Sequence, residues 1–216
     1  MQNEEELWNS YFYPNTEVLI NNFGIKDFQK LKEVEATISF EKLMELNQKP
    51  LDLGLDKKHL LKLHEFIFGD IYPFAGKYRK VNISKGIGTF LFIRDDTTID
   101  KYLDNLFEQA RINLERCYSK HDFAEILAYL YTNLIYCHPF REGNGRAVRE
   151  FIREFSIKKS LKISEIPLEL DWRLIDKDEL NKHLEVAHLY PSQTALLFNK
   201  ALVPLNLNSI DKKGTR

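Results

Sequence analysis

The sequence predicts an all-α domain that carries one β-hairpin. Apolar residues recur at helical spacing through most of the chain, and the stripe from Ile99 through Leu106 to Ala110 is a clear example. Only residues 79–93 alternate as a pair of strands does, with Lys-Gly-Ile-Gly at residues 85–88 as the turn. A chain of 216 residues can bury one sizeable core, so we expect a single helical domain.

Start and stop signals place the helices along the chain. Asp56 is a good N-cap and Gly69 a good stop for the helix between them. Asp122 and Glu125 have the spacing of a capping box for the helix that leads to the polar loop described below. His64 lies on the apolar side of its helix, where we expect a core residue with no catalytic role. The periodicity predicts helices over residues 27–47, 56–69, 99–114, 122–134, 148–155, 176–189 and 192–202.

The predicted domain extends over residues 1–216 without an internal repeat or a low-complexity linker. Its last part is polar and is expected to fray. The parts are an N-terminal arm and helix (1–55), a core (56–162) with the hairpin (79–93) and a polar loop (138–149), C-terminal helices (163–205) and a tail (206–216).

Composition narrows the class of protein. The chain has 31 basic and 32 acidic residues, so no global charge favours binding to nucleic acid or to an anionic membrane. No apolar run approaches the length of a membrane span. Two cysteines in helical patterns, Cys117 and Cys137, do not make a disulfide framework. We therefore expect a soluble cytoplasmic protein that contacts neither nucleic acid nor membrane.

The polar loop between two apolar helices has the composition of an anion site. Gly143 and Gly145, on either side of Asn144, allow backbone conformations in which amide N–H groups turn toward an anion at a helix start. Arg146 and Arg149 lie three residues apart in the first turns of the next helix and so share a face. Both guanidinium groups suit phosphate oxygens, which makes a polyphosphate the predicted ligand.

Two further residues of the loop add chemistry to this anion site. Glu142 is a hard oxygen ligand of the kind that Mg²⁺ takes once or twice from a protein, leaving its other positions to water and phosphates. His138 is the only residue of the loop with an ordinary pKa near neutrality, so it is the candidate general base.

Residues 138–149 read His-Pro-Phe-Arg-Glu-Gly-Asn-Gly-Arg-Ala-Val-Arg and resemble the signature of the Fic family at every specified position. Residues 69–76, Gly-Asp-Ile-Tyr-Pro-Phe-Ala-Gly, are similar to the family's segment before its flap hairpin. Residues 11–16, with Leu19, are similar to the N-terminal lead-in of bacterial members. The resemblance covers the chain from about Tyr11 to about Leu189. It implies a Fic-type helical bundle with one β-hairpin flap.

The resemblance also implies an activity, the Mg²⁺-dependent transfer of AMP from ATP to a protein hydroxyl. By this carry-over His138 accepts the proton of a Ser, Thr or Tyr of the target, and Glu142 holds the metal. Residues 143–145 form the anion-binding turn, and Arg146 and Arg149 orient the outer phosphates. The hairpin 79–93 is then the flap, along which an extended segment of the target protein pairs.

Other classes of site fit the residues less well. A zinc site needs a third protein ligand that no Cys or His cluster supplies, and a Walker loop needs Gly-Lys-Ser/Thr after its glycines. A catalytically silent nucleotide-binding module stays open, and His138 is the residue that such a module would not need.

Control of the activity is predicted from a missing motif. Family members are commonly restrained by Ser/Thr-x-x-x-Glu-Gly/Asn, whose glutamate pairs with the second signature arginine. Only Thr37 to Glu41 approaches this pattern, with Lys42 in place of Gly or Asn. We therefore expect a small antitoxin-like partner to supply the glutamate to Arg149, with self-restraint through Glu41 as the alternative.

Overall fold

The computed structural model describes residues 4–83, 96–185 and 191–206. Most of the predicted hairpin 79–93 lies outside these residues, and residues 79–83 have no regular secondary structure. The chain divides into two compact units. Unit 1 comprises residues 1–102 and 137–147, and unit 2 comprises residues 103–136 and 148–216.

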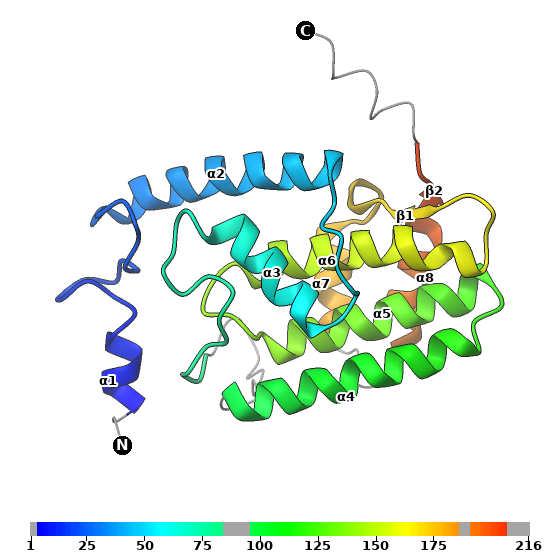
Figure 1. Cartoon of the computed structure of the whole chain (residues 1–216), viewed down its shortest axis with the longest axis horizontal. Coiled ribbons are helices and arrows are strands. Elements are labelled where there is room, and N and C mark those ends of the chain that lie inside the picture. Colours follow the sequence, from blue (N-terminus) through cyan, green and yellow to red (C-terminus); the bar gives the residue numbers. More distant parts are fainter. Residues whose placement is uncertain (1–3, 84–95, 186–190, 207–216) are drawn as a thin grey trace, which may run out of the picture. The chain divides into compact units, whose positions relative to one another are not determined.

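The described part of the chain is mainly helical, which confirms the predicted fold class (Figure 1). The helices are α1 (Glu4–Asn9), α2 (Phe28–Gln48), α3 (Lys57–Phe68), α4 (Asp96–Glu115), α5 (Lys120–Cys137), α6 (Asn144–Lys159), α7 (Lys177–Glu185) and α8 (Pro191–Ala201), with 3-10 turns at Ser160–Lys162 and Trp172–Leu174. The prediction of a single domain stays a prediction.

In unit 1, helices α2 and α3 pack side by side, and each begins at an aspartate cap, of which Asp56 was predicted. The Asp27 carboxylate accepts a hydrogen bond from Lys30 N at 2.7 Å, and that of Asp56 accepts one from His59 N at 3.0 Å. Helix α3 ends before Gly69, as predicted. Its buried face, which includes Leu60, Leu63, Ile67 and Phe68, forms part of the core of this unit.

In unit 2, the predicted cap of α5 is wrong by one turn. Ser119 Oγ accepts from Asp122 N at 3.1 Å, and the Asp122 carboxylate accepts from Ser119 N at 3.0 Å. The reciprocal pair is therefore Ser119 with Asp122, because the helix begins at Lys120 and places Asp122 inside its first turn. Asp176 does cap α7, since its carboxylate accepts from Glu179 N at 2.8 Å.

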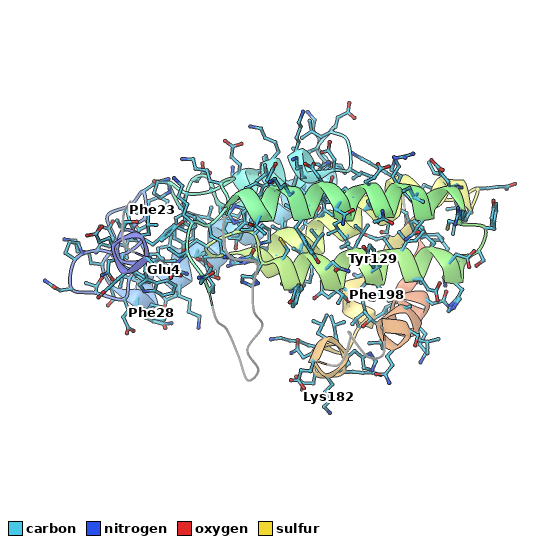
Figure 2. The ribbon with its side chains drawn as sticks, turned by 90° about the horizontal axis from the view of Figure 1, so that it is seen from below. Glu4, Phe23, Phe28, Tyr129, Lys182 and Phe198 are labelled. Carbon is cyan, nitrogen blue, oxygen red and sulfur yellow. The ribbon has the colours of Figure 1, made fainter. Side chains whose placement is uncertain are left out.

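Aromatic rings hold the C-terminal part of unit 2 together. Phe198 of α8, labelled in Figure 2, lies 5.5 Å from the ring of Tyr131 and 5.6 Å from that of Trp172. Phe107 and Phe151 make a similar contact at 5.4 Å. These pairs join α8 to α5 and to the turn that carries Trp172, and they join α4 to α6.

A small sheet in unit 2 was not predicted. Strands β1 (Leu168–Leu170) and β2 (Leu202–Pro204) pair antiparallel, with Glu169 opposite Val203. Each strand has three residues, which is too short for alternation to register in the sequence. Helix α8 accordingly ends at Ala201, where β2 begins.

None of the described helices is both long enough and apolar enough to cross a membrane.

Candidate active site

His138 is the first residue after helix α5 and has an uncommon backbone conformation. Its φ is 45°, in the left-handed region that residues other than glycine seldom adopt. Such strain persists only where the surroundings fix it, and it concentrates at functional sites. The candidate general base is therefore held in a particular direction by its backbone.

Arg79, the first residue of the predicted flap 79–93, makes several hydrogen bonds to that backbone. Its side chain is fully buried. Nε donates to the carbonyl of His138 at 2.8 Å and Nη2 to that of Cys137 at 3.3 Å. Nη1 donates to Val81 O at 2.7 Å, and the backbone N–H of Arg79 donates to Pro139 O at 2.9 Å. Burial lowers the pKa of the guanidinium.

The loop after His138 is closed by Asn144 and by the lack of a side chain at Gly143. The Asn144 amide accepts from Phe140 N at 2.8 Å and donates to Phe140 O at 2.7 Å. Gly143 has φ 80°, and a Cβ there would lie 2.4 Å from the Phe68 ring. Helix α6 then begins at Asn144, so Asn144 and Gly145, two residues of the predicted anion-binding turn 143–145, lie at a helix start.

His64 packs under the loop, as expected for a core residue, but it also makes two specific bonds. Its ring stacks on Phe140 with 3.7 Å between centroids. Nδ1 accepts from Gly76 N at 2.9 Å, so the ring proton lies on Nε2, which donates to Glu142 O at 2.8 Å. Burial lowers the pKa of His64 to about 4, and the imidazole is neutral at physiological pH.

Arg146 is held by helix α2. Its guanidinium donates to the carboxylate of Glu35 and, at 2.8 Å, to Ser39 Oγ one turn later. Tyr72 OH donates to the other carboxylate oxygen of Glu35. Burial first, and then this carboxylate, raises the pKa of Tyr72. Glu41, the predicted alternative source of self-restraint on this helix, is exposed, and Glu35 is the acidic residue that contacts Arg146.

Arg149 lies three residues beyond Arg146 on α6 and belongs to unit 2. Arg149 is exposed, and its backbone carbonyl accepts a hydrogen bond from Trp172 Nε1 at 3.1 Å. Burial raises the pKa of Tyr131, and the positive charge of Arg149, followed by a hydrogen bond with its side chain, opposes this rise.

Glu142 is the predicted Mg²⁺ ligand. It is half-buried, and Gly143 N donates to its Oε1 at 3.1 Å. Within residues 4–83, 96–185 and 191–206, no group of three or more His, Cys, Asp or Glu side chains is placed to hold a metal. One carboxylate beside an anion-binding helix start nevertheless suits Mg²⁺, which takes its other ligands from water and phosphates.

Arg141, at the variable position of the signature, is enclosed by the N-terminal arm. Its guanidinium lies 4.6 Å from the ring centroid of Trp8, 5.0 Å from that of Phe12 and 5.5 Å from that of Tyr11. These cation–π contacts join the arm to the signature loop within unit 1.

The structure brings together His138, Glu142, Gly143, Asn144, Gly145 and Arg146 in one loop and helix start of unit 1. The sequence profile of the Fic/DOC family matches residues 54–156. The probable protein adenylyltransferase y4lH of Sinorhizobium fredii is 32% identical over 159 residues, which are 73% of this chain and 80% of that protein. The chain therefore belongs to the Fic/DOC family.

The chain is also similar to proteins of two Bartonella species. The protein adenylyltransferase VbhT of Bartonella schoenbuchensis is 33% identical over 173 residues, which are 80% of this chain but only 34% of VbhT. The crystal structure of BepC from Bartonella tribocorum with bound AMPPNP has a TM-score of 0.72 and 25% identity, and covers 92% of this chain and 98% of that one.

Proposed function

We propose that this protein transfers AMP from ATP to a hydroxyl side chain of a target protein. The observation that carries the proposal is the intact signature, in which His138 stands four residues before Glu142 and six before a helix start suited to phosphate. Relatives at 32–33% identity are named protein adenylyltransferases or probable ones, and the BepC structure holds an ATP analogue. Both facts support the same chemistry here.

In this reaction His138 removes the proton of the target hydroxyl as its oxygen attacks the α-phosphorus. A new P–O bond forms, the bond between the α-phosphorus and the bridging oxygen breaks, and pyrophosphate leaves. The first amides of α6 and the guanidinium groups of Arg146 and Arg149 bind the phosphate oxygens, and Glu35 with Ser39 orients Arg146. Most of the rate enhancement then comes from positioning and charge stabilisation.

Glu142 is the residue that would hold Mg²⁺, which when bound neutralises charge on the phosphates. The hydrogen bonds of Gly143 N to the Glu142 carboxylate and of His64 to the Glu142 carbonyl fix both ends of this residue. Their effect is to orient the carboxylate before any ligand arrives.

ATP labelled on the α-phosphate or on the γ-phosphate tests the reaction. We expect label on protein only from the α-position, with release of pyrophosphate, and a drop of about a hundredfold or more in His138→Ala. Label from the γ-position would indicate phosphorylation instead. Binding of ATP without transfer to any protein of a bacterial lysate would favour the silent nucleotide-binding module.

We infer that the target pairs its backbone along the flap, residues 79–93. The first residue of the flap, Arg79, is hydrogen-bonded to the signature loop, which supports a docking edge close to His138. A strand edge binds through main-chain groups, so proline at Thr89 should lower transfer to the target while ATP affinity persists. Loss of ATP affinity in the same variant would contradict a docking role.

We also propose that the activity is restrained in trans, by a small antitoxin-like protein whose glutamate pairs with Arg149. The exposure of both Arg149 and Glu41 supports this arrangement over self-restraint. Glu41→Gly should then leave AMP transfer unchanged, and a large gain by this variant without any partner would overturn the proposal. We place the protein in the cytoplasm, where ATP is abundant and the unpaired Cys117 and Cys137 stay reduced.

A further inference from the structure

Arg79 is a buried cation whose guanidinium donates to backbone carbonyls, two of which lie at the C-terminal end of helix α5. A buried charge is costly unless it is fully hydrogen-bonded. Cys137 is the last residue of the helix, and its carbonyl is one of the last four, which accept no hydrogen bond from within the helix. The C-terminal end of a helix also carries partial negative charge, which favours a cation there. The guanidinium thus fits the position electrostatically.

The geometry gives these bonds a second consequence. The Cys137 carbonyl belongs to the peptide plane that precedes the Cα of His138, and the His138 carbonyl belongs to the plane that follows it. Nη2 and Nε of one planar guanidinium bind these two carbonyls, at 3.3 and 2.8 Å. Because φ and ψ of His138 are the rotations of these two planes about its Cα, Arg79 constrains both angles at once.

The next peptide plane is fixed by the same residue. The backbone N–H of Arg79 donates to Pro139 O at 2.9 Å. Three successive carbonyls, those of residues 137, 138 and 139, are therefore bound by Arg79. His138 has the strained φ of 45° in the middle of this segment. Strain of this kind needs surroundings that determine it, and Arg79 supplies them.

We propose that Arg79 is a positioning residue for His138: its guanidinium locks the left-handed backbone of the base and so aims the imidazole. The residue touches neither substrate nor the reacting atoms in this account. Lysine cannot replace it, because an ammonium is a point charge on a flexible stem and lacks a planar fork that spans two carbonyls. The kinetic part of the inference rests on the proposed AMP transfer, and the conformational part does not.

Arg153 offers a matched control. It is also a buried arginine, but its guanidinium binds the carboxylates of Glu150, at 2.6 Å, and Glu169, at 3.3 Å, within unit 2. Arg153→Lys, like Arg79→Lys, keeps the positive charge of a buried side chain and disturbs its packing and hydrogen bonds. It should not alter the backbone of His138.

The first readout needs no activity. The imidazole resonances of His138, assigned by their loss in His138→Ala, are compared by NMR in the wild type, Arg79→Lys and Arg153→Lys. We expect them to shift and broaden in Arg79→Lys and to stay in place in Arg153→Lys. If Arg79→Lys does not fold, Arg79→Gln, which keeps a planar amide donor, is measured in its place. Unchanged His138 resonances in a folded Arg79 variant would overturn the inference.

The second readout separates binding from chemistry. We expect Arg79→Lys to lower kcat for AMP transfer about ten- to a hundredfold, since misplacement of a reacting group by about 1 Å has effects of this size. Its Kd for ATP should change less than threefold, and Arg153→Lys should keep kcat within twofold at temperatures where it is folded. A wild type without transfer would refute the proposed function alone. A folded Arg79→Lys with wild-type kcat, beside an active wild type and an inactive His138→Ala, would refute the role of Arg79 alone.

Discussion

Arg79 and Arg153 are two buried arginines that face opposite kinds of partner. Arg79 binds the carbonyls of Cys137, His138 and Val81, whereas Arg153 binds the carboxylates of Glu150 and Glu169. The first set of bonds fixes the direction of a backbone, and the second neutralises charges that burial would otherwise disfavour. The same side chain therefore serves conformation in one region and stability in the other.

The largest expected effect is the loss of unfolding free energy when Arg153, which binds two carboxylates, is replaced. Arg153→Met leaves Glu150 and Glu169 without their cation, and breaking a buried ion pair costs about 3–5 kcal/mol of unfolding free energy. Urea denaturation measures the change. Arg173→Met is the control, because Arg173 pairs with Asp171 while its own side chain is 87% exposed. A comparable loss in both variants would contradict the distinction between buried and exposed pairs.

His64 is a neutral donor to the signature loop, so the free energy of unfolding should depend on pH through this residue. Its pKa is about 4 in the folded protein against 6.5 in the unfolded chain, so the unfolded chain binds the proton first. The stabilisation is complete above pH 6.5 and is lost as the pH falls from 6.5 toward 4, by about 3 kcal/mol in all.

Urea denaturation at several pH values checks this window. His64→Gln should flatten the decline, while His121→Gln, at an exposed histidine, should leave it unchanged. A wild-type unfolding free energy that stays constant between pH 6.5 and 4 would contradict a neutral His64 between Gly76 and Glu142.

A smaller loss of stability is expected where Gly143 of the loop packs closely against Phe68 of α3. Gly143→Ala adds a Cβ at 2.4 Å from the Phe68 ring, whereas Gly24→Ala, at a similar φ of 68°, meets nothing within 4 Å. Both carry the strain of a positive φ, but overpacking should cost Gly143→Ala about 2 kcal/mol more. Thermal and urea unfolding of the two variants measure the difference. Equal costs would show that Phe68 moves aside freely.

The smallest expected effect concerns Arg146, which has a carboxylate partner as Arg153 does but lies in the signature. Glu35→Gln keeps the shape of the side chain and removes its charge, so we expect a loss of about 1 kcal/mol of unfolding free energy. Glu41→Gln, on an exposed turn of the same helix, should change it by less than about 0.5 kcal/mol. Denaturation curves for the pair test whether Glu35, rather than Glu41, contacts the signature.

Much of the fold could be predicted because its signals are local. Helix α2 begins directly after its predicted start, Asp27, and α3 begins at the predicted cap Asp56 and ends before Gly69. The sheet of β1 and β2 could not be predicted, because its stability depends on pairing between segments more than thirty residues apart in sequence and each strand is short. Ser119 was missed as a cap because Asp122 has the same chemistry and the residue spacing fits both choices.

The candidate site was predictable only as far as its contiguous motif extends. Glu142, Gly143, Asn144, Gly145 and Arg146 lie within eight residues of His138 in the sequence, and the loop brings them together.

The residues that hold this loop in place come from distant segments. Arg79 was predicted as part of the alternating hairpin and His64 as core, and no sequence pattern singled out Glu35. No local pattern marks an arginine that will be buried against carbonyls, because the carbonyls belong to every residue. Only the fold reveals these partners.

The central claim, that Arg79 acts through His138, is tested most directly by a double-mutant cycle in the rate of AMP transfer. Arg79→Lys, His138→Ala and the double variant are compared with the wild type, each saturated with ATP and followed by mass spectrometry over hours. If Arg79 only aims the imidazole, Arg79→Lys lowers the wild-type rate about ten- to a hundredfold and leaves the residual rate of His138→Ala unchanged. Equal fold-losses in both backgrounds would contradict the account.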